Sequence, residues 1–353
     1  MLIERPVDFA NGFRMCCVNC RASNWLSPEE YAESPESMMN CSSCGDAFNF
    51  GPAVIELADA EDPALDDTAV PQLAWYHTTT DPEWPGPSKI IPEGQLQGLR
   101  AIGWREDQLK RHQKKWENQA IHLGTYEAAI DSMLRRMRNQ DDQHSVFYLH
   151  RVRLRPDLVI EPGWRDENSA QAASVTTFDL ASQGIDGIRY LNAYEAIGSL
   201  SLAVVHNSIE STQRIVLPIA PIVGKPDEDV LAQLGVLRDQ VCTTFAEHLD
   251  DELTPLAKLR QGRAAQTGKA AAMVPLEVYG VIRKMEALAA DNYLQGLSPV
   301  AKDNFLRSLH SPGPGATYEK DRAWLEKFMG LAALLTHHEE VQQFLTVQPR
   351  RAP

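Results

Sequence analysis

The sequence predicts an α+β protein in three parts, with a mixed β-sheet in its central part. Two pairs of cysteines mark a compact module near the N-terminus. Between residues 72 and 222, short apolar runs of strand character alternate with one or two helical patterns. Beyond residue 226 the pattern changes to long amphipathic runs, which predict a helical bundle. A chain of 353 residues is long enough for two or three such domains.

Domain boundaries follow from changes in composition. The stretch ADAEDPALDDTAVP has no hydrophobic periodicity and ends in proline, so it is interpreted as an acidic linker. The sequence therefore predicts the following parts: a cysteine module at 1–57, the linker at 58–71, an α+β domain at 72–222 and a helical domain at 226–353.

Short apolar runs give the strands of the central domain, which are predicted at 73–78, 146–154, 187–192, 201–206 and 214–222. A helix is predicted from Thr125 onward, because Ala128, Ala129, Met133 and Met137 recur at helical spacing and Thr125 can cap the first turn. The C-terminal helical runs cover 227–249, 276–294 and 321–345, with loops predicted at 261–268 and 311–315.

Charge is distributed unevenly along the chain, whose formal net charge is −14. Residues 1–70 hold three basic and thirteen acidic side chains, whereas residues 100–155 hold twelve basic and seven acidic ones. A phosphate-bearing ligand would therefore prefer the middle of the chain. No run of about 20 apolar residues is present, and the N-terminus lacks the layout of a signal peptide, so no membrane partner and a cytoplasmic location are expected.

The cysteine module contains two C-x-x-C pairs, Cys17 with Cys20 and Cys41 with Cys44, separated by 20 residues. Each pair places two thiolates on one tight turn, and four thiolates suit tetrahedral zinc, so a structural zinc ribbon is predicted. Cys16 is an alternative to Cys17 as a ligand, although C-x-x-x-C is the poorer spacing. The acidity around the ribbon favours docking to protein over binding to nucleic acid.

Three segments of the central domain, taken together, resemble the ADP-ribosyltransferase family, in particular its bacterial and phage-associated branches. The first is Trp75-Tyr76-His77-Thr78-Thr79, and the second runs from Ile121-His122-Leu123-Gly124-Thr125 into the predicted helix. The third is Asp186-Gly187-Ile188-Arg189-Tyr190-Leu191-Asn192-Ala193-Tyr194-Glu195, continued by Gly198-Ser199-Leu200-Ser201. The resemblance covers roughly residues 73–210, and Ala196 departs from the family, which often has an acid after the glutamate.

The resemblance implies an enzyme that cleaves NAD at its nicotinamide bond. Glu195 would be the catalytic carboxylate, because a ribosyl cation needs a fixed negative charge beside it. His77 would contact the adenosine ribose, and Thr78 would help to seat NAD. His122, Gly124 and Thr125 would line the same cleft, with the helix N-terminus offering amides to the pyrophosphate. Tyr190 and Ser199 complete the NAD residues that the resemblance implies.

The function expected from this resemblance is mono-ADP-ribosyl transfer to a macromolecular acceptor, protein or nucleic acid, as in toxins or host-modifying effectors. Two alternatives remain open: NAD hydrolysis, and a catalytically silent fold that binds partners through the ribbon and the helical domain. The basic residues of the middle region are interpreted as solvated helix faces, although they could also receive a polyanionic acceptor. They are Lys110, Arg111, Lys114, Lys115, Arg135, Arg136 and Arg138.

Overall fold

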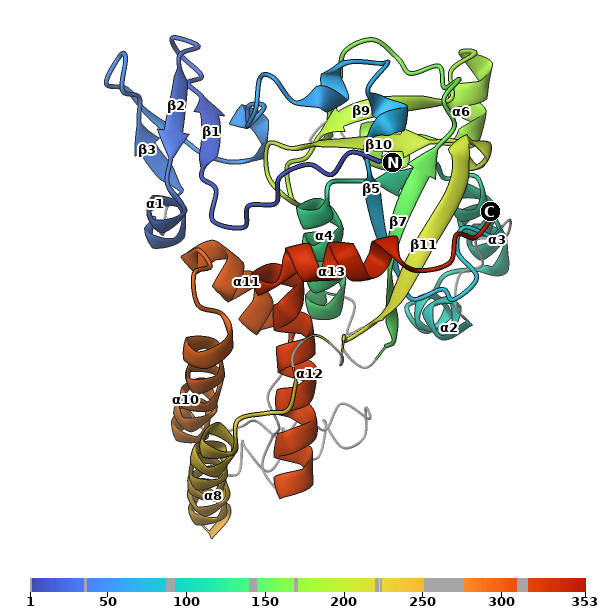
Figure 1. The fold of residues 1–353 in the computed structure, drawn as a ribbon. Coiled ribbons are helices and arrows are strands. Elements are labelled where there is room, and N and C mark those ends of the chain that lie inside the picture. The colour runs from blue at the N-terminus through green and yellow to red at the C-terminus, as the bar shows by residue number, and fades with distance from the viewer. Residues whose placement is uncertain are drawn as a thin grey trace. The chain divides into compact units, whose positions relative to one another are not determined.

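The structure is a computed structural model that describes residues 2–34, 37–86, 93–139, 145–167, 171–219, 222, 224–250, 276–309 and 317–353. The chain forms two compact units (Figure 1). Unit 1 contains Met1–Leu217, Ser298–Asn304 and His338–Pro353, and unit 2 contains Pro218–Leu297 and Phe305–His337. Both loops predicted in the C-terminal part, at 261–268 and 311–315, lie outside the described residues.

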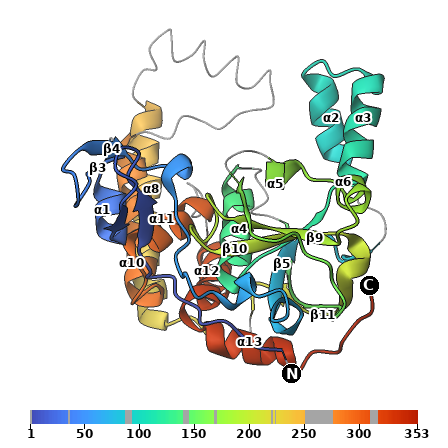
Figure 2. The same cartoon turned by 90° about the horizontal axis from the view of Figure 1, so that it is seen from above.

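Two β-sheets form the centre of unit 1, as the predicted α+β class requires (Figure 2). One has the strand order β6-β10-β9-β8 and the other the order β11-β7-β5. All neighbours are antiparallel except β8 and β9. The strands are β5 (Trp75–Thr79), β6 (Ile121–Leu123), β7 (Phe147–Leu154), β8 (Arg165–Asp166), β9 (Gly187–Leu191), β10 (Leu200–Val204) and β11 (Ile209–Leu217).

Helices connect and cover these strands. The helix predicted from Thr125 is α4 (Tyr126–Asn139), and the Ala128 amide donates to the Thr125 hydroxyl at 3.1 Å, as a helix cap requires. The remaining helices of this region are α2 (Glu93–Ala101), α3 (Glu106–Glu117), α5 (Gln171–Ser174) and α6 (Thr177–Ser182). On α3, the basic residues Lys110, Arg111, Lys114 and Lys115 are exposed, in agreement with a solvated face.

The two sheets meet where Tyr76 of β5 faces Gly124 at the end of β6. Each residue donates its amide to the carbonyl of the other, at 3.0 Å in both directions. A side chain at position 124 has no room, since its Cβ would lie 2.7 Å from the Cβ of Ala128 and 3.0 Å from the Ser201 hydroxyl. Glycine at this position therefore allows β5, β6, β10 and α4 to approach one another closely.

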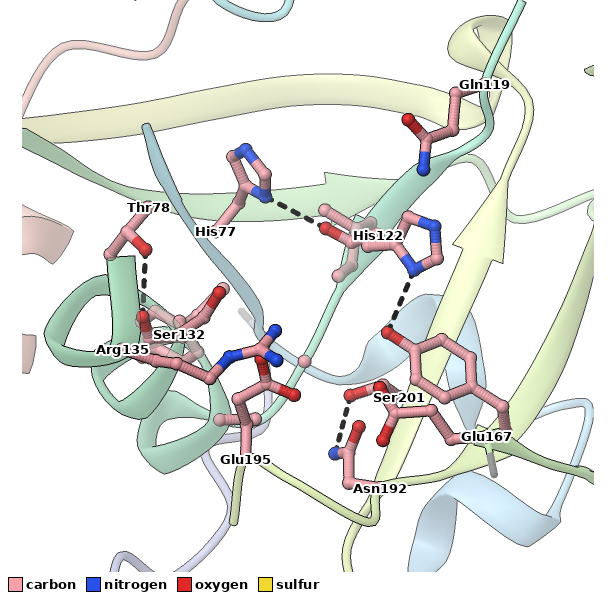
Figure 3. A pocket seen from close by; sticks show the side chains of 16 residues that line it. His77, Thr78, Gln119, His122, Ser132, Arg135, Glu167, Asn192, Glu195 and Ser201 are labelled. Carbon is pink, nitrogen blue, oxygen red and sulfur yellow. Dashed lines mark hydrogen bonds and ion pairs between the residues drawn. The ribbon is translucent and has the colours of Figure 1, made fainter. Parts of the chain in front are cut away.

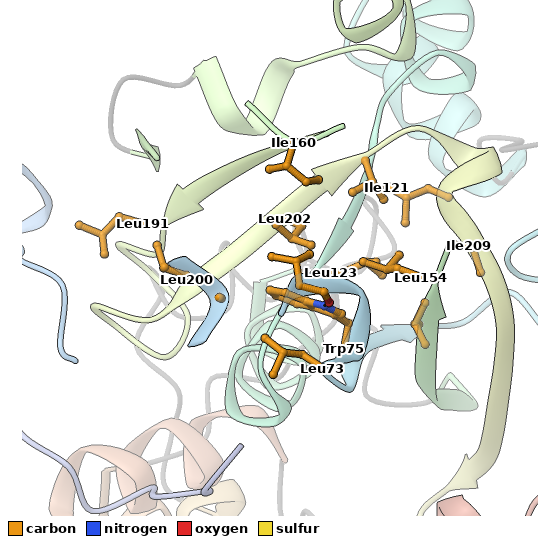
Figure 4. Packing of buried hydrophobic residues seen from close by; sticks show 14 of the residues in the cluster. Leu73, Trp75, Ile121, Leu123, Leu154, Ile160, Leu191, Leu200, Leu202 and Ile209 are labelled. Carbon is orange, nitrogen blue, oxygen red and sulfur yellow. The ribbon is translucent and has the colours of Figure 1, made fainter. Parts of the chain in front are cut away.

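An apolar core fills the space around this junction (Figure 4). Trp75, Leu123 and Leu202 are almost fully buried in it, as are Ala64 and Val70 from the acidic stretch predicted as a linker. Residues 63–65 and 70–72 form short 3₁₀ turns there. The guanidinium of the buried Arg189 pairs with Asp67 and donates to the carbonyl of Ala64. Residues 58–71 are therefore packed against the sheets rather than extended as a free spacer.

The N-terminal module consists of two small hairpins and one short helix. Strands β1 (Phe13–Cys16) and β2 (Ser23–Leu26) pair, and so do β3 (Met38–Asn40) and β4 (Ala47–Asn49). Helix α1 (Pro28–Glu33) has a capping box at Ser27 and Glu30. The buried side chains of Phe13, Phe48 and Phe50 form the core of the module.

Both ends of the chain bind the sheet that contains β5, β7 and β11. Near the N-terminus, Glu4 accepts from Arg151 of β7 at 2.6 Å and from the Tyr76 hydroxyl. Near the C-terminus, the Gln213 side chain of β11 donates to the carbonyls of Thr346 and Gln348 at 2.7 and 2.8 Å. These bonds explain why helix α13 (His338–Thr346) belongs to unit 1, although the sequence predicted one helical domain from residue 226.

Unit 2 is helical. It contains α8 (Glu228–Asp250), α10 (Leu276–Tyr293) and α12 (Tyr318–Thr336), while α11 (Pro299–Ser308) begins in unit 1 and ends in unit 2. The buried Asp321 of α12 accepts from Arg238 of α8 at 2.9 Å. The helix predicted across 321–345 is in fact two helices, since α12 ends before His337 and α13 begins at His338.

The strand boundaries differ from the prediction in ways that local chemistry explains. The last strand was predicted at 214–222, but β11 starts at Ile209 and ends before Pro218. Proline has no amide to donate to a neighbouring strand, so it ends the pairing. At 201–206 the predicted strand runs too far, because His206 begins a short 3₁₀ turn.

None of the helices in the described part of the chain has the length and apolar character that crossing a membrane requires.

We predict that Gly124→Ala lowers the free energy of unfolding by about 1–3 kcal/mol, because the added methyl group meets Ala128 and Ser201 at the sheet junction. The measurement is urea unfolding followed by circular dichroism. Gly98→Ala is the matched control, since Gly98 lies on α2, a methyl group added there would meet nothing within 4 Å, and alanine favours a helix. Equal stability of wild type and Gly124→Ala would contradict the tight junction.

Candidate functional site

The four predicted zinc ligands come together at one end of the N-terminal module. The sulfurs of Cys17, Cys20, Cys41 and Cys44 all lie within 4.8 Å of one another. Cys17 Sγ is 3.8 Å from Cys44 Sγ, and Cys20 Sγ is 3.5 Å from Cys41 Sγ. A tetrahedron with zinc–sulfur bonds of about 2.3 Å has edges of about 3.8 Å, so the four sulfurs fit a zinc ion.

The backbone and side chains around the sulfurs suit thiolate ligands. Asn24 donates to Cys41 Sγ at 3.6 Å, and the Ser43 amide donates to it at 3.4 Å. Gly45 follows the second cysteine pair with a φ of 77°, and Arg21 follows the first pair with a φ of 62°. Both turns therefore need a left-handed residue, which glycine adopts more easily than arginine.

Cys16 is not part of this group. Its sulfur lies 3.8 Å from the carbonyls of Cys17 and Arg21, on the β1 strand that leads into the first turn. The choice between Cys16 and Cys17 is thus resolved in favour of Cys17. With four protein ligands and no position for a substrate, a zinc ion here would stabilise the fold of the module and would not take part in catalysis.

A cavity of about 240 Å³ lies where the two sheets meet, and most of the residues implied in NAD binding line it (Figure 3). His77 and Thr78 come from β5, His122 from β6, and Gly124 from the turn before α4. Tyr190 comes from β9, and Glu195 comes from the loop between β9 and β10. The other residues of its lining are Tyr76, Gln119, Leu123, Ala128, Ala129, Ser132, Arg135, Glu167, Asn192 and Ser201.

The two histidines of the cavity are held by defined contacts. His77 Nδ1 lies 2.9 Å from the carbonyl oxygen of His122, and its ring stacks on Trp84 with a centroid distance of 4.3 Å. His122 Nδ1 lies 3.0 Å from the Tyr190 hydroxyl. Because one nitrogen of each ring is engaged in this way, the orientation of both imidazoles in the cavity is fixed.

Glu195 lies on a loop whose backbone amides donate hydrogen bonds to two carboxylates, one on each side of Glu195. The Ala193 amide donates to Glu167 at 2.6 Å, and the Ala196 amide donates to Asp131 at 2.9 Å. Ala196 has a φ of 41°, which is uncommon for a residue with a side chain, so the loop adopts a strained conformation directly after Glu195. The contact with Asp131 helps to hold that conformation.

Three acidic groups with raised pKa values gather around this loop. Burial raises the pKa of Glu195 to about 7, with Arg135 lowering it and the nearby Glu167 and Asp131 raising it. Burial also raises the pKa of Asp131 to about 6, against the hydrogen bond from the Ala196 amide, and raises the pKa of Glu167. Clusters of buried ionisable groups with shifted pKa values are typical of functional sites.

Two of the predicted NAD residues do not line this cavity. Thr125 caps α4, and its buried side chain accepts from the Ala128 amide. Ser199 accepts a hydrogen bond from the Asn192 side chain at 2.8 Å, which also donates to Ser201 at 2.8 Å. Both Thr125 and Ser199 line a separate cavity of about 400 Å³. Their contacts support the Glu195 loop and the start of α4.

Sequence analysis missed Arg135, which was interpreted as part of a solvated helix face. Its guanidinium lines the cavity and pairs with the carboxylate of Glu195. A signal was present, because Ala128, Ser132 and Arg135 follow one another at helical spacing and all three face the cavity. Arg136, by contrast, packs over the ring of Phe147 at 5.1 Å.

Comparison with known proteins adds no relative to this description: no protein-family model, no curated protein and no solved structure matches the chain. Support for a function therefore comes from the residues of the cavity and from the fold that positions them.

We predict that metal analysis of the purified chain gives about one equivalent of zinc, which Cys41→Ser removes because three thiolates no longer close the tetrahedron. The same substitution should lower the thermal stability of the N-terminal module. Cys16→Ser is the control and should keep the full zinc content. Zinc loss in Cys16→Ser with retention in Cys41→Ser would overturn the ligand assignment.

The raised pKa of Glu195 predicts a pH dependence of stability. Folded Glu195 holds its proton up to a pH of about 7, whereas an ordinary glutamate releases its proton near 4.5. The folded state is therefore stabilised by this bound proton at low pH, and that stabilisation is lost as the pH rises through 7. The free energy of unfolding should fall between pH 5 and 8, by up to about 3 kcal/mol from this group. In Glu195→Gln the fall should be smaller, whereas Glu210→Gln, on exposed β11 surface, should behave as wild type.

Equal slopes of unfolding free energy against pH in wild type and Glu195→Gln would show that Glu195 titrates in the folded chain as it does in the unfolded chain.

Proposed function

We propose that this chain is an NAD-dependent mono-ADP-ribosyltransferase, which moves ADP-ribose from NAD to a macromolecular acceptor and releases nicotinamide. One observation carries the proposal. The carboxylate of Glu195 and the ring of His77, from segments far apart in the sequence, line the same cavity together with His122 and Tyr190. These are residue types that a ribose diol and a developing ribosyl cation require at one place.

The reaction breaks the bond between ribose C1′ and the nicotinamide nitrogen. Nicotinamide leaves with the bonding electrons and becomes neutral, so positive charge grows on the ribose ring. An ionised Glu195 beside that ring stabilises the charge. A nucleophilic oxygen or nitrogen of the acceptor then bonds to C1′, and its proton passes to Glu195 or to solvent.

Burial of Glu195 supports this role in two ways. Its side chain is only 10% exposed, so a charge on its carboxylate is weakly screened by water and acts strongly on a nearby cation. Its pKa of about 7 allows it to exchange a proton with the acceptor near neutral pH. Clusters of buried ionisable groups with shifted pKa values are typical of catalytic sites, so this arrangement favours an enzyme over an adaptor without catalytic activity.

The size of the cavity sets how NAD would bind. Pockets that enclose a whole small ligand are about 300–1000 Å³, and this cavity measures about 240 Å³. It would therefore take the nicotinamide ribose end, with His77 and Glu195 in its lining, and the rest of NAD would lie on the adjoining surface. The proposed position of His77 differs in this respect from the adenosine contact that the family resemblance implies.

The acceptor would approach over the neighbouring helix α3. This helix ends two residues before Gln119, which lines the cavity, and its basic side chains Lys110, Lys114 and Lys115 are exposed. In a chain of net charge −14, these side chains offer a local site for an acidic or phosphate-rich stretch of a macromolecule.

We predict that the purified chain releases nicotinamide from NAD and that Glu195→Gln reduces the rate at least about 100-fold, since the amide cannot carry the stabilising charge. Nicotinamide is measured by liquid chromatography. Glu210→Gln, exposed on β11, is the matched control and should retain the wild-type rate. Intact NAD after prolonged incubation with wild type across pH 6–9 would refute the proposal.

A second assay separates transfer from hydrolysis. NAD labelled in its adenylate is incubated with the chain and a cell lysate, and the label is followed after protease and nuclease digestion. Label that stays with protein or nucleic acid supports transfer and identifies the acceptor class. Label found only in free ADP-ribose, with or without lysate, would show that water is the acceptor and that the chain is an NAD glycohydrolase.

A further inference from the structure

The guanidinium of Arg135 lines the cavity beside the loop that carries Glu195. It lies beside Glu195 in Figure 3 and pairs with its Oε1. The carbon Cζ of Arg135 lies 6.0 Å from the ring centre of Tyr194. The Arg135 side chain is 43% exposed, whereas that of Glu195 is 10% exposed. A cation that solvent can reach therefore sits on a carboxylate that solvent scarcely reaches.

The surroundings of Glu195 would otherwise favour its protonated form. Asp131 of α4 lies on one side of the loop, and Glu167, after β8, lies on the other. The groups that line the same cavity from the strands and the adjoining loop are the phenol of Tyr190, the amide of Asn192 and the imidazoles of His77 and His122. Among the described residues that line this cavity, Arg135 is the one arginine or lysine.

Removing Arg135 leaves the charge of the buried Glu195 carboxylate without a paired cation. Without Arg135, Glu195 would take up a proton more readily, because the carboxyl groups of Glu167 and Asp131 lie beside it and disfavour a further negative charge. A protonated Glu195 can no longer stabilise a cation, and its carboxyl group can rotate to seek a hydrogen-bond acceptor. The ion pair thus controls both the charge and the direction of this side chain.

We propose that Arg135 is the positioning residue of the site: by pairing with Glu195 it favours the ionised form of that carboxylate and directs it into the cavity. Arg135 acts here through Glu195 and makes no contact with the reacting bond. The electrostatic part of this proposal concerns Glu195 in the free protein, and its consequence for catalysis rests on the proposed transferase function.

Carbon-13 NMR of protein labelled at the glutamate carboxyl carbons tests the electrostatic part without any substrate. Comparison with Glu195→Gln assigns the Glu195 signal. In wild type its titration midpoint should lie near 7, and in Arg135→Gln it should rise by about one pH unit or more. Arg135→Lys should keep the midpoint near that of wild type. Arg138→Gln is the matched control, since Arg138 is exposed on the same helix and does not line the cavity.

An unchanged midpoint in Arg135→Gln would overturn the proposal. Arg135→Ala repeats the test with a second variant, and circular dichroism of each protein confirms that the titration reports a folded chain. A merely structural role for Arg135 would lower stability and leave the midpoint where it is, so the two roles give different results.

The activity arm measures nicotinamide release from NAD between pH 6 and 9. Arg135→Gln should lose about fivefold or more at pH 7 and recover toward the wild-type rate at pH 9, where the carboxylate forms without help. Parallel wild-type and variant profiles, or a variant faster than wild type at every pH, would contradict the positioning role. If wild type is inactive at every pH, the transferase function fails, and the NMR titration still decides the ionisation of Glu195.

Discussion

The reciprocal backbone bonds between Tyr76 and Gly124 are the constraint on which the cavity depends. They join two sheets that otherwise have separate strand orders, and they place the side chains that follow Tyr76 opposite those that precede Gly124. The imidazole of His77 then reaches the carbonyl of His122. With no side chain at 124, α4 lies close enough to bring Arg135 into the same space. The cavity between the two sheets is therefore lined by polar groups in fixed positions.

The loop between β9 and β10 carries Glu195 into that cavity and is itself held by several hydrogen bonds. Ala193 donates its amide to Glu167 and Ala196 donates its amide to Asp131. The Asn192 side chain donates to the hydroxyls of Ser199 and Ser201 on the other arm of the loop. These bonds offset the strained backbone of Ala196 and the burial of Glu195. Glu167 and Asp131 are engaged by backbone amides, whereas Glu195 pairs with the side chain of Arg135 and lines the cavity.

Local sequence signals predicted the fold where they are strong and independent of distant partners. Every residue of strands β9 and β10 is buried, and apolar side chains make up most of both strands. Thr125 alone marks the start of α4. The cysteine spacing likewise located a four-sulfur group. Strand β6 was harder to predict because three residues give too little periodicity, and its place depends on pairing with β10.

The parts of the site that escaped prediction depend on contacts made over long stretches of sequence. A charged residue on an amphipathic helix normally faces water, and only the distant Glu195 gives Arg135 a different environment. The acidic stretch at 58–71 was expected to be a linker because aspartates dominate it, yet Ala64 and Val70 are buried and Arg189 supplies the charge that Asp67 needs. Partners of this kind cannot be recognised from the residues nearby in the chain.

The connectivity of the two units has a mechanical consequence. The polypeptide passes from one unit to the other four times, because Ser298–Asn304 and His338–Pro353 return to unit 1 after helices of unit 2. Neither body is made from one unbroken length of chain. Cleavage at a single passage would leave three covalent connections intact, so a protease would have to cut all four before the helical unit could diffuse away from the sheets.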